Sequence, residues 1–254
     1  MDTRPAGTGA GAVMDQDWWR VLGLAPAQRP ELLVVEGSWW RRDRERQRLA
    51  RLREVRELGA PDWWWGTFDG RAVVYACVYG AARTVEPVHV FGQLGTPTVV
   101  QLGSCGALAP GLVPGDLVVP TRVRIGEGAS AHYGGTGSVA ATADLSAVLA
   151  RVAAGAGHTV RQGPTVTTEV LLRQPPDLVA SWRAGGALAV DMETSATFSA
   201  AAWAGMRHAA LLHVWDDVSA GRSWTEDLPP ALDERRRGAE RDQFELAVRA
   251  AIGA

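Results

Sequence analysis

Apolar residues along the chain form short continuous runs bounded by glycine, proline or acidic residues. Such runs predict buried strands, and they occur at residues 31–35, 71–79, 98–102, 117–119 and 209–215. The first is expected to break at Glu36-Gly37 and the third to stop at Gly103. A shorter run at 188–190 leads through Asp191 into a segment of small residues. The pattern predicts a sheet assembled from distant parts of the chain.

Helical spacing of apolar positions separates these strands. The Arg- and Glu-rich residues 41–58 place Leu49, Leu52, Val55 and Leu58 along one face, opposite a solvated charged face. Further helices are expected at residues 84–94, 145–153, 191–204 and 239–252, the last packing back over the sheet. Because strands alternate with helices, we expect an α/β protein with a parallel or mixed sheet covered on both faces.

Length and composition favour one folded domain. The 254 residues are 46% hydrophobic and 21% charged, which is typical of a globular protein. Residues 1–14 lack the basic start and apolar centre of a signal peptide, so we expect a flexible tail followed by a domain at 15–254. The stretches 126–140 and 218–232 are expected to be functional loops.

Charge and cysteine content limit the classes of partner. A net charge of −2 gives no field that would hold nucleic acid, and no apolar run approaches the ~18 residues that a membrane span needs. Two cysteines do not make the disulfide framework of a small secreted domain. We therefore expect a cytoplasmic protein. Because the sequence contains no lysine, an anion site has to use arginine or backbone N–H groups.

Candidate chemistry gathers after three predicted strands, where ligands bind in such sheets. In QLGSCGAL, Gly103, Ser104 and Gly106 suit a cradle in which backbone N–H groups and a hydroxyl hold an anion, or else a tight turn beneath the sheet. In AVDMETS, Asp191 and Glu193 flank Met192; the carboxylates suit a grip on ribose hydroxyls, or else a helix cap and a helix-dipole partner.

Two carboxylates follow the strand that ends in LLHVW. Crowding of Asp216 and Asp217 raises one pKa and suits a general acid, although a paired turn carboxylate is the alternative. His213, inside the strand, is interpreted as a satisfied core histidine. The histidines show no metal-ligand spacing, so no metal is predicted. The eleven tryptophans, including Trp39-Trp40, favour burial or subunit contact over base stacking.

Taken together and in order, these segments resemble a family of nucleoside-cleaving enzymes. The strand and turn LGSCGALAPGLVPGDLVVP, the VDMET helix start and the strand ending in WDD are similar to those of hexameric-type purine nucleoside phosphorylases, uridine phosphorylases and methylthioadenosine nucleosidases. The segment GEGASAHYGG resembles one in the uridine phosphorylases. The resemblance covers roughly residues 31–254. It implies a single-domain three-layer sandwich around a mixed central β-sheet, and a homodimer or trimer of dimers.

The resemblance also implies a phosphate site. Gly37, Arg41 and Ser104 match phosphate-binding positions, and Arg56 matches an arginine lent by the neighbouring subunit. The family's third phosphate arginine falls at Gln101, which is neutral and cannot form a charged fork with a dianion. Losing one charged hydrogen bond costs about 1.5–3 kcal/mol, which weakens phosphate binding without excluding it.

Ribose and base positions follow from the same resemblance. Glu193 matches the ribose carboxylate with Met192 beneath the sugar, and Asp216 matches the acid that protonates a purine. The base site further includes Thr168 and Asp191, and the family's stacking aromatic falls near Leu171. The loop 168–177 is short, and Arg173 with Gln174 is the alternative match to the Gln/Arg pair that holds a pyrimidine in the uridine phosphorylases. One of the arginines at 235–237 is expected to assist the acid.

These parts predict cleavage of the N-glycosidic bond of a purine-like nucleoside. Phosphorolysis to the free base and ribose 1-phosphate, a pentosyltransferase reaction with inorganic phosphate as co-substrate and no cofactor, is the preferred route. Hydrolysis is the alternative because of Gln101. The third hypothesis is a non-catalytic nucleoside-binding protein with the same fold. Asp216 argues against it, because a protein that only binds needs no acid at that strand end. A nucleotide-binding regulator is disfavoured because the chain has no GxGxxG or phosphate-loop lysine motif.

Overall fold

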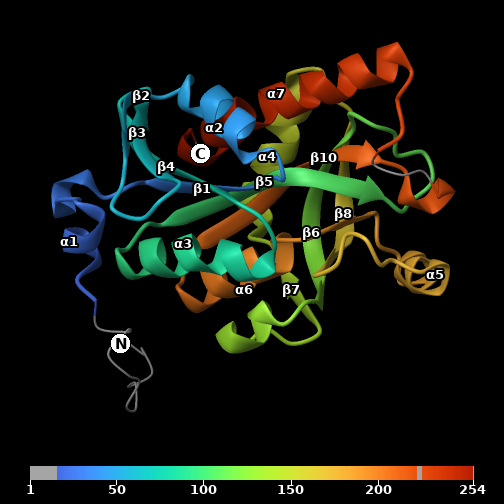
Figure 1. Ribbon diagram of the computed structural model, residues 1–254, viewed down its shortest axis with the longest axis horizontal. Coiled ribbons are helices and arrows are strands. Elements are labelled where there is room, and N and C mark those ends of the chain that lie inside the picture. Colours follow the sequence, from blue (N-terminus) through green and yellow to red (C-terminus); the bar gives the residue numbers. More distant parts are fainter. Residues whose placement is uncertain (1–15, 222–224, 254) are drawn as a thin grey trace.

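The computed structural model describes residues 16–221 and 225–253, and the predicted tail at 1–14 lies outside them. Within the described residues, one mixed sheet holds every strand (Figure 1). In chain order the strands are β1 (Leu32–Gly37), β2 (Arg53–Glu57), β3 (Trp63–Phe68), β4 (Arg71–Val78), β5 (Thr98–Ala107), β6 (Leu117–Gly126), β7 (Ser138–Ala140), β8 (Val160–Thr168), β9 (Ala189–Asp191) and β10 (Arg207–Asp216). The α-helices are α1 (Trp18–Leu22), α2 (Arg41–Leu49), α3 (Ala81–Gln93), α4 (Ala143–Gly155), α5 (Pro176–Ala184), α6 (Thr194–Trp203) and α7 (Pro230–Ile252).

Strand β5 is the hub of the sheet. It pairs in parallel with β1 and β10 and antiparallel with β9. Strands β10, β6, β8 and β9 pair in that order and return to β5, while β1, β4, β3 and β2 extend from its other side. The carboxyl ends of β1, β5 and β10 therefore meet at one edge, which is where ligands bind in parallel arrangements.

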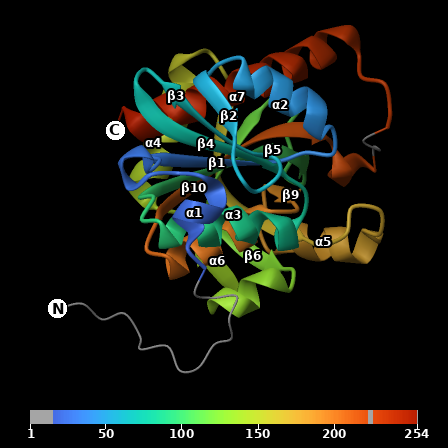
Figure 2. The ribbon, with the colours of Figure 1, turned by 60° about the vertical axis from the view of Figure 1, so that its left-hand side comes forward.

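Helices cover both faces of the sheet, which confirms the predicted three-layer α/β sandwich. Helices α2, α4 and α7 lie on one face, and α1, α3 and α6 lie on the other (Figure 1). Helix α5 lies outside both layers, at the side of the sheet, in both ribbon views (Figure 2).

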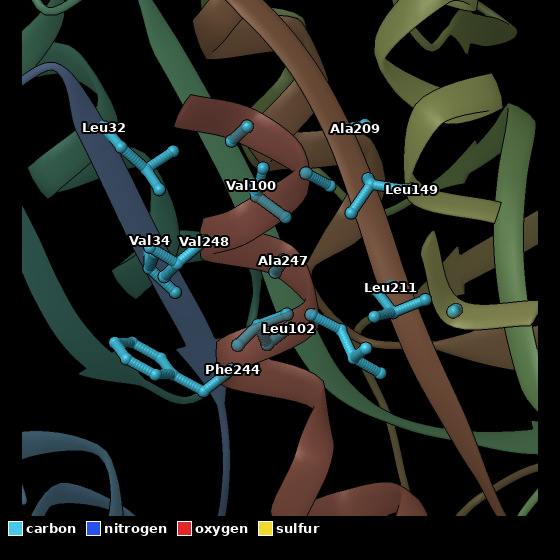
Figure 3. Packing of buried hydrophobic residues seen from close by; sticks show 14 of the residues in the cluster. Leu32, Val34, Val100, Leu102, Leu149, Ala209, Leu211, Phe244, Ala247 and Val248 are labelled. Atoms are coloured by element: carbon cyan, nitrogen blue, oxygen red, sulfur yellow. The ribbon is translucent and has the colours of Figure 1, made fainter. Parts of the chain in front are cut away.

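The apolar runs are continuous because the central strands are buried on both sides. In Figure 3, Phe244, Ala247 and Val248 of α7 pack against Val34 and Leu102 of the sheet. The alternate residues of the same strands belong to a second cluster under α1 and α3, which contains Leu33, Val35 and Val99. Successive side chains of a strand point to opposite faces, so a strand covered twice needs apolar residues at every position.

Several predicted boundaries were wrong. Strand β1 continues through Glu36 and Gly37, and β5 continues past Gly103 to Ala107. The helix predicted at 41–58 ends at Leu49, and residues 53–57 form β2 against β3. The register of that pair shifts between Arg53 and Arg56, where Glu54 has a positive φ of 53°. An exposed edge strand with a bulge has the same Arg- and Glu-rich composition as the solvated face of a helix. The spacing of apolar residues therefore predicted a helix where the structure has a strand.

Some elements were not predicted. Strand β3, strand β8 and helix α5 had no sequence assignment. The predicted loop 126–140 contains a 3₁₀ turn at Ala129–Tyr133 and strand β7, and the loop 218–232 contains a 3₁₀ turn at Val218–Ala220 and the start of α7. No helix in the described part of the chain is long and apolar enough to cross a membrane.

Candidate active site

A cavity of about 650 Å³ opens at the carboxyl ends of β1, β5, β9 and β10. Helix α5 and the segment that follows β1 complete its walls. The predicted site residues in its lining are Gly37, Ser104, Leu171, Asp191, Met192, Glu193 and Asp216. The fold therefore brings together residues up to 179 positions apart, from Gly37 to Asp216. Arg41, Arg56, Gln101 and Thr168 are not part of the lining.

Strand β10 delivers Asp216 to this cavity. The β5–β10 register shifts between Val214 and Asp216, so Asp216 lies opposite Gly106. A Cβ added to Gly106 would lie 3.1 Å from Asp216 Oδ1, so the carboxyl group lies directly over the glycine backbone. Burial raises the pKa of Asp216 to about 7, with a further contribution from the negative charges of Asp217 and Glu226. A carboxyl group that is half protonated near neutral pH can act as a general acid.

The second carboxylate of the WDD sequence has a different role. Asp217 accepts hydrogen bonds from Ser219 Oγ at 2.6 Å and from Ala220 N at 3.1 Å. It thereby caps the 3₁₀ turn that follows β10. The sequence left two roles open for this pair, a general acid and a turn carboxylate. Asp217 is the turn carboxylate, and Asp216 lines the cavity.

Glu193 lies buried between two glycines. Gly80 N donates to Glu193 Oε1 at 2.7 Å, and a Cβ added to Gly37 would lie 2.4 Å from the Glu193 carboxyl carbon. Only glycine at position 37 leaves room for this carboxyl group. Burial and the nearby carboxyl group of Asp191 raise the pKa of Glu193 to about 8. Met192 lines the cavity beside it, with Tyr79 Oη 3.5 Å from the Met192 sulfur.

Asp191 holds the turn between β9 and α6. Its Oδ1 accepts from Thr167 Oγ1 at 2.6 Å, and its Oδ2 accepts from Glu193 N at 3.0 Å and Thr194 N at 2.7 Å. Burial raises the pKa of this carboxyl group. Both oxygens are therefore engaged with protein donors, and they fix the backbone that carries Glu193.

Gln101 lies beneath Gly103 and does not line the cavity. Side chains alternate along a strand, so Gln101 lies on the face opposite Ser104, three positions later in β5. Its Oε1 accepts from Thr194 Oγ1 at 2.8 Å and its Nε2 donates to Leu102 O at 2.7 Å. The amide is satisfied under the site and supplies no charge to it.

Two arginines that were not predicted, Arg44 and Arg183, line the cavity. Arg41 lies on the surface, where its guanidinium pairs with Asp62 at 2.8 Å. Arg44, one turn further along α2, is buried in the lining and pairs with Glu240 and, at 3.8 Å, with Glu36.

Glu36 is the centre of a buried ion-pair network. It accepts two hydrogen bonds from Arg48, at 2.8 and 2.9 Å, and one from Tyr75 Oη at 2.9 Å. Burial acts to raise the pKa of Glu36, but the Arg48 charge and hydrogen bonds outweigh it and the pKa is lowered. The two buried arginines of α2, Arg44 and Arg48, thus share the buried carboxylates of Glu36 and Glu240.

The remaining predicted residues lie outside the lining or at its edge. Arg56 donates to Gly23 O at 3.1 Å and to Gln28 Oε1 at 3.2 Å within its own subunit. Thr168 is buried at the end of β8. Gln174 lines the cavity whereas Arg173 does not.

Of the arginines at 235–237, Arg236 lies nearest the cavity wall. Its guanidinium stacks over the Trp215 ring at 3.8 Å. Arg235 pairs with Asp116 and Arg237 with Asp233, and none of the three belongs to the lining.

Two features of the cavity were missed from the sequence. The first is an aromatic wall of Trp39, Trp40, Tyr79 and Trp215, in which the rings of Trp40 and Trp215 stack with centroids 4.9 Å apart. The second is His213, interpreted from the sequence as a satisfied core residue, which lines the cavity with one nitrogen bonded to Gln243. The sequence gave no signal for His213, because the face of β10 on which it lies is known only from the structure.

The chain resembles known nucleoside phosphorylases over most of its length. A model of the phosphorylase superfamily matches residues 64–250. The chain is 25% identical over 233 residues to a guanosine phosphorylase of Halorubrum lacusprofundi, covering 88% of this chain and 92% of the relative. It is 28% identical over 224 residues to a DeoD-type purine nucleoside phosphorylase of Myxococcus xanthus, covering 84% and 92%.

The fold has a counterpart among solved structures. The crystal structure of a uridine phosphorylase from Vibrio fischeri superposes with a TM-score of 0.78 at 19% identity, covering 91% of this chain and 95% of that one. Together with the match of the family model to most of the sequence, these observations identify the chain as a member of the phosphorylase superfamily of nucleoside-cleaving enzymes.

Proposed function

We propose that this protein cleaves the N-glycosidic bond of a nucleoside with a purine-like base. The observation that carries the proposal is the buried carboxyl group of Asp216 in the cavity, whose pKa of about 7 keeps a proton available near neutral pH. As the C1′–N bond lengthens, the base gains negative charge, and a proton given to purine N7 relieves it. A pyrimidine has no ring nitrogen at the corresponding position, so the acid favours purines.

Glu193 and Met192 would hold the ribose. The Glu193 carboxyl group accepts from the Gly80 amide, so its position is fixed before the sugar arrives. Hydrogen bonds from ribose hydroxyls to such a preorganised group convert binding energy into orientation of C1′. Met192 supplies an apolar contact beneath the sugar. For the base, Leu171 gives an apolar surface, and the aromatic wall contains Trp215, the residue before Asp216.

The nucleophile is either phosphate or water. Membership of the phosphorylase superfamily supports phosphate, with no cofactor needed. Two predicted phosphate positions favour water, because Gln101 is neutral and outside the lining and Arg41 is paired with Asp62 on the surface. Arg44 and Arg183, which line the cavity, favour phosphate. We therefore favour phosphorolysis, with hydrolysis as the second candidate.

Assembly of the active unit belongs to the same proposal. We expect a homodimer or a trimer of dimers in which a neighbour completes the site. Arg56 donates to Gly23 and Gln28 of its own chain, so its release toward a neighbour's phosphate would have to replace two hydrogen bonds.

Product analysis tests the function. Adenosine, inosine, guanosine and uridine are incubated with the enzyme, and free base is separated from intact nucleoside by chromatography. We expect turnover of at least one purine nucleoside and none of uridine. Uridine cleavage without purine cleavage would refute the role of Asp216 as a purine acid, and binding without cleavage of any of the four would favour the non-catalytic reading.

A further inference from the structure

One face of helix α5 forms a wall of the active-site cavity. Its lining residues are Pro176, Val179, Ala180 and Arg183, which we call the α5 face. These positions are three or four residues apart, so they lie on one side of the helix. Three of them are apolar, and the fourth, in the last turn, carries a guanidinium group. The α5 face is therefore a hydrophobic wall that ends in one positive charge.

Arg183 is not committed to a carboxylate of the protein. Its side chain makes no hydrogen bond or ion pair with residues 16–221 or 225–253, and it is exposed, so a molecule in the cavity can reach it. Arg44, by contrast, is buried and pairs with Glu36 and Glu240. A guanidinium group has five N–H donors and no acceptor. Arg183 therefore offers the cavity hydrogen-bond donors that are available to an oxygen of a ligand.

The two arginines belong to different walls. Arg44 lies on α2, which follows Gly37 at the end of β1, whereas Arg183 lies on α5. The two helices are apart in both ribbon views (Figures 1 and 2). A phosphate held near Gly37 is therefore served by Arg44, and Arg183 is left for another part of the substrate.

Contacts place the α5 face next to the acid. Val179 packs against a cluster that includes Val190, and Val218 packs against the same cluster. Val190 and Val218 also surround Gly106, because a Cβ added there would lie 3.4 Å from Val190 and 2.4 Å from Val218. The same Cβ would lie 3.1 Å from Asp216 Oδ1. The α5 face and the acid therefore border the same part of the cavity.

Arg183 and Asp216 are the charged groups of this part. Arg183 follows Val179 by one helical turn, which separates the Cβ atoms of such residues by about 5–6 Å. The base subsite, defined as Leu171, Val179, Arg183, Asp216 and Val218, thus combines an apolar surface with one acid and one cation. A base held there meets a proton donor at one ring nitrogen and a guanidinium group at a neighbouring atom.

The atoms on the edge of a purine decide what a guanidinium group can bind there. Next to N7, guanine and hypoxanthine carry the acceptor O6, whereas adenine carries an amino group that donates. A group that only donates matches the oxygen and opposes the amino group. In addition, the base gains negative charge as the C1′–N bond lengthens, and part of this charge resides on O6. A cation beside O6 stabilises that charge in the transition state.

We propose that Arg183 donates to the carbonyl oxygen of a 6-oxopurine, so that inosine- and guanosine-type nucleosides are preferred to adenosine. The inference rests on the proposed function, in which Asp216 protonates N7, and it goes further by naming the class of base and the residue that selects it. The acid and the cation then act on adjacent atoms of one edge of the base.

The first test uses the wild-type protein. The ratio kcat/KM is measured for inosine, guanosine, adenosine and purine riboside, which has no substituent at C6. We expect inosine and guanosine to exceed adenosine by about 10- to 100-fold, with purine riboside between them. A value for adenosine equal to or above that for inosine would overturn the inference and leave the proposed cleavage intact. Absence of cleavage of all four would remove the proposed function as well.

The second test uses a matched set of variants. Arg183→Met removes the donors and keeps an unbranched side chain, so kcat/KM for inosine should fall by about 10- to 100-fold and that for adenosine by less than about threefold. Arg183→Glu supplies an acceptor instead and should invert the preference toward adenosine, which a merely structural role would not do. The control is Arg151→Met, which changes an exposed arginine of α4 outside the cavity lining.

The remaining outcomes also decide the question. Equal losses on inosine and adenosine in Arg183→Met would overturn the inference, because Arg183 would then support the site without reading the base. A raised KM for phosphate with an unchanged ratio of inosine to adenosine would overturn it in favour of a phosphate contact. If circular dichroism shows that the variants are unfolded, product inhibition of the wild type is measured. We expect hypoxanthine to bind at least about tenfold more tightly than adenine, and equal inhibition by the two bases would overturn the inference.

Discussion

The Asp216→Asn substitution removes the acid and leaves the shape of the site. Asparagine has nearly the same volume, and the carboxyl group it replaces lies over Gly106, where a side chain of this size already fits. The amide carries no proton that a base can take. The variant therefore separates the proton transfer from the binding of the nucleoside.

The size of the effect follows from the ionisation of Asp216. At its ordinary pKa of 3.8 only roughly one carboxyl group in 1,600 would be protonated at pH 7, whereas a pKa of about 7 keeps about half of them protonated. General acids contribute about 100- to 10,000-fold to rate, so we expect kcat on purine nucleosides to fall within that range. For the wild type, kcat should fall about tenfold per pH unit above pH 7 as Asp216 ionises.

Two controls isolate the proton. Asp217→Asn changes the neighbouring carboxylate, which caps the turn with Ser219 and Ala220, and it should leave most of kcat. A 4-nitrophenyl riboside has a leaving group that needs no proton, so Asp216→Asn should cleave it at close to the wild-type rate. Equal losses on the nitrophenyl riboside and on the purine nucleoside would refute the assignment of Asp216 as the acid.

Three further predictions concern the supports of the site. Because the pKa of Glu193 is raised from 4.5 to about 8, its contribution to stability is complete below pH 4.5 and is lost as pH rises through 8. Glu193→Gln should abolish turnover and should raise Tm at pH 8 but not at pH 4.5. An equal change of Tm at the two pH values would contradict this. Arg48→Met leaves Glu36 buried with a broken ion pair and should cost about 3–5 kcal/mol in urea unfolding, and a cost below about 1 kcal/mol would exclude the network as a structural element. Gly37→Ala should raise KM about tenfold by displacing the Glu193 carboxyl group. The control is Gly155→Ala, whose Cβ meets nothing within 4 Å. Equal KM values for the two variants would show that Glu193 tolerates the displacement.

Much of the sheet and the position of its active edge could be predicted from the sequence. Central strands covered on both faces must be apolar at consecutive positions, so β1, β4, β5 and β10 are legible without coordinates. Polar residues directly after such strands mark their carboxyl ends. This is why Ser104, Glu193 and Asp216 were predicted, and all three line the cavity.

Edge elements and side-chain directions were not predictable in this way. Residues 53–57 are Arg- and Glu-rich in either a helix or an edge strand, and only pairing with the tryptophans of β3 decides between them. The motif match put a phosphate arginine at Arg41, but the helix turns that side chain toward Asp62 and brings Arg44 inward. Residues three apart lie on neighbouring parts of one helix face, so the composition of the segment does not show which of the two arginines reaches the cavity.

The sequence by itself determined the fold class, the family and the carboxylates at the strand ends, because strand burial and the residues that follow a strand can be recognised within a few consecutive positions. Tertiary structure alone decided the partners. Gln243 of α7 meets His213 of β10 across 30 positions, with Gln243 Oε1 3.0 Å from His213 Nδ1. Strand parity places Gln101 on the face of β5 opposite Ser104. The chemistry of the cavity depends on these distant contacts, since hydrogen bonds and charge pairing between separate elements set which atoms face it and with what charge.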